Sequence, residues 1–140
     1  MPLTKLSRDQ VIKIINAARD RGERIDLRGT DLRGTDLREL DLSGAKLTSA
    51  LVSGAFLQGV ILNRAKLSGV RLSGVKMNEA RLIGTKLNDA DLSGADMRHV
   101  NLFAADLSGA DLSGADLSEA NLFGTDLSNA DLSGTDLSGA

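Results

Sequence analysis

Histidine and serine are the residues of this chain that could support nucleophilic catalysis, and neither stands in a catalytic pattern. His99 is the single histidine, so a nucleophilic triad could form only around it. The serines recur at one position of a five-residue unit, which favours a structural role, and His99 follows at a position expected to face outward at a turn. The chain has no cysteine, which excludes disulfides and thiolate chemistry. We therefore expect no catalytic residues and no enzyme activity.

Two binding motifs begin in this sequence but are not completed. Residues 89–94, Asp-Ala-Asp-Leu-Ser-Gly, resemble the opening of a calcium-binding loop, but Val100 stands where the loop requires a bidentate glutamate. Glycines five residues apart, such as Gly29 and Gly34, match the start of a phosphate-binding loop, yet no Gly-Lys-Ser/Thr follows them. The sequence predicts neither a metal site nor a cofactor site.

A five-residue period explains these near matches and dominates the chain. Residues 25–139 divide into 23 pentapeptides with no insertion or deletion. The third position is Leu in 20 of the 23, the first is Ala, Thr or Val in 21, and the fifth is Gly in 14, while the second is usually Asp and the fourth usually Ser. In extended chain the first and third residues point to one side and the second to the other. Because Gly readily adopts the positive φ of a sharp turn, we expect one bend every five residues.

The repeated unit also carries a family resemblance. Residues 90–94 read Ala-Asp-Leu-Ser-Gly, and the same five letters return at residues 110–114 and 130–134. This unit resembles the A(D/N)LXX repeat of the pentapeptide repeat proteins, and the resemblance covers about 80% of the chain. It implies an all-β fold, a right-handed quadrilateral β-helix with Leu and Ala inside. At 20 residues per coil, the repeats would form about six coils, paired through backbone hydrogen bonds about 4.8 Å apart.

Residues 7–21 depart from the period and predict a helix. Ser7 is the expected N-cap, Gln10 completes a capping box, and Gly22 follows the end. The apolar side chains lie largely on one side; they are Val11, Ile12, Ile14, Ile15 and Ala18. Because a solenoid needs its terminal coil covered, we expect residues 1–24 to form a capping segment and residues 25–140 the β-helix. A helix that contacts a membrane or a partner is the alternative.

The C-terminal end shows no comparable helix, because the repeat runs to Gly139. An open coil edge invites pairing with another chain. Either this end is a homodimer interface or the chain is cut from something longer. The resemblance adds that gyrase-protecting members of the family dimerise head-on through their C-terminal ends.

Charge divides the chain into two halves. Residues 1–88 carry 16 Lys and Arg against 9 Asp and Glu, whereas residues 89–140 carry 1 against 10. The N-terminus has no signal-peptide core, and no apolar run approaches the ~18 residues of a membrane span. We expect a cytoplasmic protein without membrane contact.

If residues 20 apart stack, the outward positions form a grid on which departures from the repeat stand out. A basic belt replaces Asp at the second position in the middle of the chain: Lys46, Lys66, Arg71, Lys76, Arg81 and Lys86. Acidic residues then return toward the C-terminus: Asp91, Asp96, Asp106, Asp111, Asp116, Asp126, Asp131 and Asp136. Large apolar residues also occupy outward positions. Three stand at second positions, namely Leu51, Phe56 and Ile61. Three more stand at fourth positions 20 residues apart, namely Ile83, Phe103 and Phe123, and we expect them to form an apolar column on the same face as Ile61.

These departures support three hypotheses about function. Aligned apolar residues on a rigid rod predict a contact surface, so the first hypothesis is a non-catalytic protein-interaction scaffold with an unknown protein partner. The second, implied by the resemblance, is a DNA-mimicking modulator of a topoisomerase such as gyrase, in which spaced carboxylates imitate phosphates. The third is binding of nucleic acid or anionic surfaces by the basic belt. Direct nucleic-acid binding is disfavoured, because the basic residues are expected on all sides of the rod and outward aromatics are few.

Overall fold

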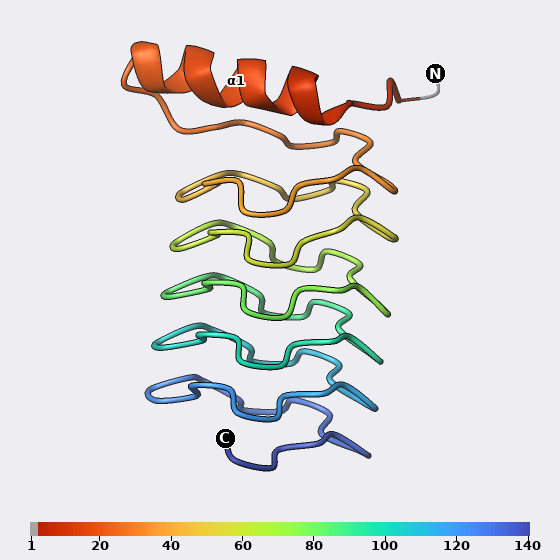
Figure 1. Cartoon of the computed structure of the whole chain (residues 1–140). Helices are drawn as coiled ribbons and strands as arrows, with labels where there is room; N and C mark the ends of the chain where they lie inside the picture. The colour runs from red at the N-terminus through yellow and green to blue at the C-terminus, as the bar shows by residue number, and fades with distance from the viewer. Residues whose placement is uncertain (1–2) are drawn as a thin grey trace.

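The computed structural model describes residues 3–140, which form one helix, α1 (Arg8–Asp20), and a stack of coils (Figure 1). The coils succeed one another from the N-terminal to the C-terminal end, and α1 lies across the first of them (Figure 1). The chain is therefore a right-handed quadrilateral β-helix with an α-helical cap at its N-terminal end, as predicted.

Local signals determine both ends of α1. The Ser7 hydroxyl oxygen accepts the Gln10 backbone N–H at 3.2 Å, and the Gln10 side-chain oxygen accepts the Ser7 N–H at 2.8 Å. This reciprocal pair satisfies two of the backbone donors that a helix start leaves unpaired. At the other end Gly22 has a φ of +64°, and its N–H donates to the Arg19 carbonyl at 3.1 Å. The helix predicted over residues 7–21 is confirmed, with bounds one residue shorter at each end.

Each repeat of the β-helix combines one turn with one short bridge to the next coil. In the fourth repeat the Ala45 N–H donates to the Leu42 carbonyl at 3.0 Å and closes the turn. The next residue, Lys46, donates to the Ile25 carbonyl one coil earlier at 2.9 Å. Second-position residues thus form isolated parallel bridges to residues 20 positions away, such as Lys46 to Lys66.

The fifth position of every repeat has a positive φ, whether or not it holds glycine. The 14 glycines of these positions have φ values of +63° to +71°. The other nine positions have φ values of +55° to +64°, and they are Glu39, Ser49, Arg64, Glu79, Asp89, His99, Ala104, Glu119 and Asn129. Closure of the coil therefore imposes the left-handed conformation, which costs a non-glycine residue about 1–2 kcal/mol.

Four faces result, and each carries a column of second-position residues. The first face holds Asp26, Lys46, Lys66, Lys86, Asp106 and Asp126. The second face holds Asp31, Leu51, Arg71, Asp91, Asp111 and Asp131. The third face holds Asp36, Phe56, Lys76, Asp96, Asp116 and Asp136. The fourth face holds Asp41, Ile61, Arg81, Asn101 and Asn121.

The interior contains the first-position and third-position side chains, as the period predicts. Third-position residues from Leu27 to Leu117 are all buried, and those from Leu82 to Leu117 are fully enclosed. Where a first position holds threonine, its hydroxyl finds a backbone partner: the buried Thr85 donates to the Leu62 carbonyl at 2.8 Å. A buried hydroxyl is tolerated only with such a partner.

α1 and the segment before it cover the first coil. Val11, Ile15 and Ala18 are buried within the core that begins at Ile25 and Leu27. Ahead of the helix, Lys5 forms a parallel bridge to Asp31, in the place that a preceding coil would occupy.

Two arginines of α1 also hold the cap to the solenoid. Arg8 donates to the backbone carbonyls of Asp36 and Arg38 at 3.2 and 3.0 Å. Arg19 donates to the Asp41 carbonyl at 3.0 Å. The sequence pattern identified the apolar side of the helix but not these contacts, because both arginines looked like ordinary solvent-facing residues.

Candidate interaction surface on the fourth face

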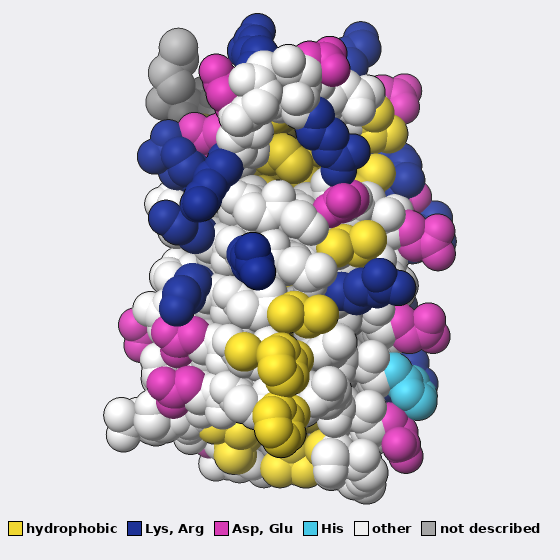
Figure 2. All heavy atoms as spheres, turned by 90° about the vertical axis from the view of Figure 1, so that its left-hand side faces the viewer, with side chains coloured by type: hydrophobic (Ala, Val, Ile, Leu, Met, Phe, Trp, Pro, Cys, Tyr) yellow, Lys and Arg dark blue, Asp and Glu magenta, His cyan; other side chains and the backbone are white. Residues whose placement is uncertain are grey.

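The fourth face of the β-helix carries an apolar column made of Ile83, Phe103 and Phe123, one residue from each of three successive coils. The two phenylalanine rings stack with centroids 5.7 Å apart and planes within 4° of parallel. Phe123 is 75% exposed and Phe103 41% exposed. Figure 2 shows the column as a run of hydrophobic side chains toward the C-terminal end of the face. Two stacked and solvated aromatic rings on a rigid support form a preorganised apolar contact surface.

Asparagines replace aspartates beside the two phenylalanines. The Asn101 side-chain oxygen accepts the Phe103 N–H at 3.0 Å, and the Asn121 oxygen accepts the Phe123 N–H at the same distance. Aspartates on other faces make the same turn contact, for example Asp111 with the Ser113 N–H at 2.9 Å. The amide therefore keeps the turn and removes the charge.

As a result the fourth face is almost free of carboxylates. Asp41 is the one acidic residue within its five repeats, and the Asp41 carboxylate lies 3.2 Å from the Arg19 guanidinium. In the coil that holds Phe123, by contrast, the second positions of the other three faces are all aspartates, and in the coil that holds Phe103 only Lys86 departs from this. The apolar column therefore lies on a face whose own second positions are neutral there, and the nearest glutamates, Glu79 and Glu119, stand at its corner with the third face.

The six predicted apolar residues do not form a single surface. Ile61 shares the fourth face with the apolar column and is half-buried. Leu51 lies on the second face and is 37% exposed, whereas Phe56 lies on the third face and is 42% exposed. The predicted column thus corresponds to stacked neighbours in the structure, whereas Leu51 and Phe56 belong to the columns of other faces.

The eight predicted acidic residues form columns on the other three faces, and each has a structural role. Every one of these aspartates accepts the backbone N–H of the residue two positions later. The Ser128 and Ser138 hydroxyls and N–H groups hold the pKa of the Asp126 and Asp136 carboxyls below the usual value. A hydrogen bond from the Arg98 side chain likewise lowers the pKa of the Asp96 carboxyl. The spacing of these carboxylates therefore follows from turn formation.

The basic belt is unevenly distributed around the rod. Lys46, Lys66 and Lys86 form a lysine column on the first face, where each is bridged to the next. The other three belt residues occupy separate faces: Arg71 the second, Lys76 the third and Arg81 the fourth. The expectation of basic residues on all sides holds, yet half of them share one face.

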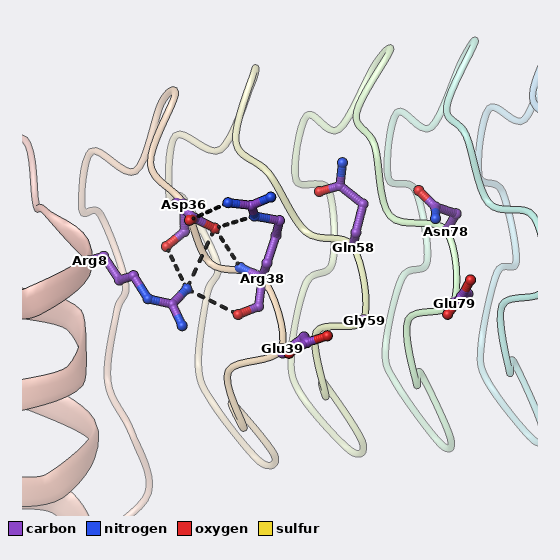
Figure 3. A pocket seen from close by; sticks show the side chains of 8 residues that line it. All are labelled: Arg8, Asp36, Arg38, Glu39, Gln58, Gly59, Asn78 and Glu79. Atoms are coloured by element: carbon purple, nitrogen blue, oxygen red, sulfur yellow. Dashed lines mark hydrogen bonds and ion pairs between the residues drawn. The ribbon is translucent and has the colours of Figure 1, made fainter.

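A polar hollow of about 560 Å³ lies where α1 meets the coils (Figure 3). Arg8 reaches into it from the helix, and Arg38 holds the Asp36 carboxylate at 2.9 Å. Gln58 also lines the hollow, and its buried side-chain oxygen has no donor. Arg8 and Arg38 both pair with Asp36, and these contacts attach the helical cap to the solenoid.

The residues considered for catalysis lie apart from one another in the fold. His99 is exposed at the corner between the third and fourth faces. Seven of the serine hydroxyls donate to aspartates of their own repeats, as Ser93 does to Asp91 at 2.6 Å, and the Ser68 hydroxyl donates to Asn88. Within residues 3–140, no group of three or more His, Cys, Asp or Glu side chains could hold a metal ion. Over the same residues, no helix has the length and apolar character needed to cross a membrane.

The sequence profile of the pentapeptide repeats (8 copies) matches residues 25–64, 65–102 and 101–139. The chain belongs to the pentapeptide repeat family. The comparison with curated proteins found no match to this chain.

Three solved structures illustrate the likeness. A pentapeptide repeat protein from the Arabidopsis thaliana thylakoid lumen is 30% identical, with a TM-score of 0.53; the match covers 76% of this chain and 64% of that one. A trypsin-treated form of QnrB1, a plasmid-mediated fluoroquinolone resistance protein, is 28% identical, with a TM-score of 0.66 and coverage of 80% and 57%. The pentapeptide repeat protein Rfr23 from the cyanobacterium Cyanothece 51142 is 24% identical, with a TM-score of 0.55 and coverage of 90% and 98%. This chain thus spans less than two thirds of the first two proteins.

Proposed function

We propose that this pentapeptide repeat protein is a non-catalytic scaffold that binds a protein partner through its fourth face. The stacked pair Phe103 and Phe123, with neutral asparagines at the second positions of their repeats, carries the proposal. Covering the exposed area of Phe123 would contribute about 3–4 kcal/mol at ~25 cal/mol per Å² of apolar surface. A contribution of that size is typical of a residue that dominates an interface.

The test compares two phenylalanines of equal exposure on different faces. Tagged wild-type protein, the variant Phe103→Ser and the control Phe56→Ser are used for affinity capture, and bound proteins are quantified by mass spectrometry. Phe56 and Phe103 are 42% and 41% exposed, so a non-specific loss of apolar surface affects both variants alike. We expect Phe103→Ser alone to lose partners. Identical partner profiles and oligomeric states for all three proteins would exclude the fourth face as an interface.

A second candidate function is DNA mimicry toward a topoisomerase such as gyrase. The three acidic columns and the likeness to QnrB1 favour it. Asn101 and Asn121 accept the same turn N–H groups that aspartates accept elsewhere. Substitution of Asp by Asn should therefore remove charge and keep the turn, which allows the role of the charge to be tested by itself. If mimicry operates, wild-type protein alters gyrase supercoiling at low salt, and Asp111→Asn/Asp116→Asn/Asp131→Asn weakens the effect. Unaltered supercoiling at micromolar wild-type protein excludes this function.

The lysine column supports a weaker third candidate, binding of nucleic acid or another anionic surface. Three lysines stacked about 4.8 Å apart concentrate positive charge on the first face. A gel shift with duplex DNA that disappears with rising salt and in Lys66→Gln is the expected result. DNA mimicry instead predicts no shift for either protein.

Homodimerisation through the C-terminal coil is a further proposal. Leu132 and Leu137 are exposed in that coil, whereas Leu27 in the first coil is covered by α1. Light scattering should give twice the mass of the chain for wild-type protein and the mass of one chain for Leu137→Lys. A single-chain mass for wild-type protein at high concentration would refute dimerisation.

A further inference from the structure

The fourth face changes character along its length. The apolar column occupies the part of the face toward the C-terminus. A hollow of about 440 Å³ lies on the part toward the N-terminus, and its lining includes Ile83, Asn63, Arg64 and Arg24. Ile83 therefore belongs both to the apolar column and to the hollow. The charged part toward the N-terminus and the apolar part toward the C-terminus form one continuous surface on this face.

The arginines of the charged part have no acidic partner within the chain. Over residues 3–140, neither Arg24 nor Arg64 forms an ion pair, and Arg81 on the same face is also unpaired. The one carboxylate among the second positions of the face, Asp41, is already held by Arg19. Three exposed guanidinium groups without an ion-pair partner in the chain are therefore available to an anion of a binding partner.

We propose that the partner segment bound by the fourth face is both apolar and acidic, with its apolar side chains on Phe103 and Phe123 and a carboxylate between Arg24 and Arg64. This inference rests on the proposed function and specifies the chemistry of the partner. The aspartates near the C-terminal end of the other three faces repel such a segment, and the lysine column of the first face has no stacked aromatic side chains beside it, so this face and one direction are favoured. A basic segment would instead be drawn to those aspartates.

The dimensions of the face limit the length of the segment. Four coil steps separate the repeat of Ser43, which lines the hollow, from that of Phe123, and these steps span about 19 Å at ~4.8 Å each. An extended peptide covers this distance with about six residues at ~3.3 Å each. A short linear segment is therefore long enough to contact both ends of the surface.

The experiment uses three fluorescein-labelled octapeptides and fluorescence anisotropy with the full chain. The probes are Glu-Glu-Ser-Leu-Ser-Phe-Ser-Phe and two relatives in which both Glu residues become Gln or Lys. We expect the Glu probe to bind most tightly. Arg24→Glu/Arg64→Glu should weaken binding of the Glu probe about tenfold and leave the Gln probe unchanged.

The variants are chosen so that folding is not in question. Glutamate already occupies the equivalent corner position at Glu39, Glu79 and Glu119 with φ values of +59° to +64°, so Arg64→Glu suits the backbone. Arg71→Glu/Lys76→Glu, on the second and third faces, changes the net charge by the same amount as the double arginine variant and should leave binding of the Glu probe intact. Phe123→Ser should weaken binding of all three probes.

Two results would overturn the inference in different ways. If binding requires Phe123 but is equal for the three probes, or strongest for the Lys probe, the face binds apolar partners of another charge and the proposed function survives. If no probe shows binding that depends on Phe123, both the partner chemistry and the fourth-face interface are rejected.

Discussion

Replacing Ala104 with glycine should stabilise the protein, because Ala104 holds a left-handed conformation that its side chain disfavours. Its φ is +55°, and it occupies the fifth position of its repeat on the fourth face. The conformation costs an L-residue about 1–2 kcal/mol, whereas glycine adds about 0.5–1 kcal/mol of backbone entropy cost on folding. The difference predicts a gain of about 0.5–1 kcal/mol for Ala104→Gly. For a chain of this length we expect the melting temperature to rise by about 2–4 °C.

The matched control lies one coil away in the same corner. Gly124 has a φ of +70°, and a Cβ placed there would lie 3.7 Å from the Ala104 nitrogen, an ordinary contact. Gly124→Ala should therefore lower stability through the backbone alone and by a similar amount. Asn129→Gly should change stability less, because asparagine tolerates this conformation better than alanine.

Calorimetry and denaturant titration of the three variants would measure these differences. An Ala104→Gly protein that is no more stable than wild type, combined with an unchanged Gly124→Ala protein, would refute the claim that coil closure imposes strain at non-glycine corners.

Three more predictions follow from the turns and the core. Arg28 and Arg33 hydrogen bonds lower the pKa of the Asp26 and Asp31 carboxyls from 3.8 to about 2, so the folded state binds fewer protons than the unfolded state. Thermal stability should therefore be constant above about pH 5 and fall as the pH drops toward 2; a melting temperature that is flat or rising over that interval contradicts this. Asp111→Ala should cost about 1 kcal/mol by removing the turn acceptor, whereas Asp111→Asn should cost little, as measured by urea unfolding; equal losses would show that charge matters more than the turn. Leu92→Ala in the fully buried core should cost about 2–5 kcal/mol in the same assay, and a loss below 1 kcal/mol would contradict close packing there.

The fold was predictable because its determinants are short-range. The alternation of small residue, aspartate and leucine assigns inward and outward positions within each repeat, and the third-position residues from Leu27 to Leu117 are indeed buried. The capping box of Ser7 and Gln10 likewise depends on residues three apart. The four-sided coil came from the family resemblance, since the five-residue period alone does not set the number of sides.

The corner conformations were predictable only in part. Glycine marks 14 of the 23 corners, and its φ preference is visible in the sequence. The same conformation at Ala104 or His99 could not be assigned from residue preference, because the neighbouring coils impose it. Similarly, Arg8 and Arg19 pair with carbonyls about 20 to 30 residues away, and no local pattern distinguishes them from other surface arginines.

By itself, the sequence determined the solenoid, its helical cap, its core and the order of basic and acidic residues along the rod. These features depend on contacts within a repeat or between repeats of constant spacing. The tertiary structure decided which departures from the repeat become neighbours: it stacked Phe103 on Phe123, placed Asn101 and Asn121 beside them, and moved Leu51 and Phe56 to other faces. The physical reason is that a surface is defined by residues 20 or more positions apart, and they meet only when each coil closes onto the next.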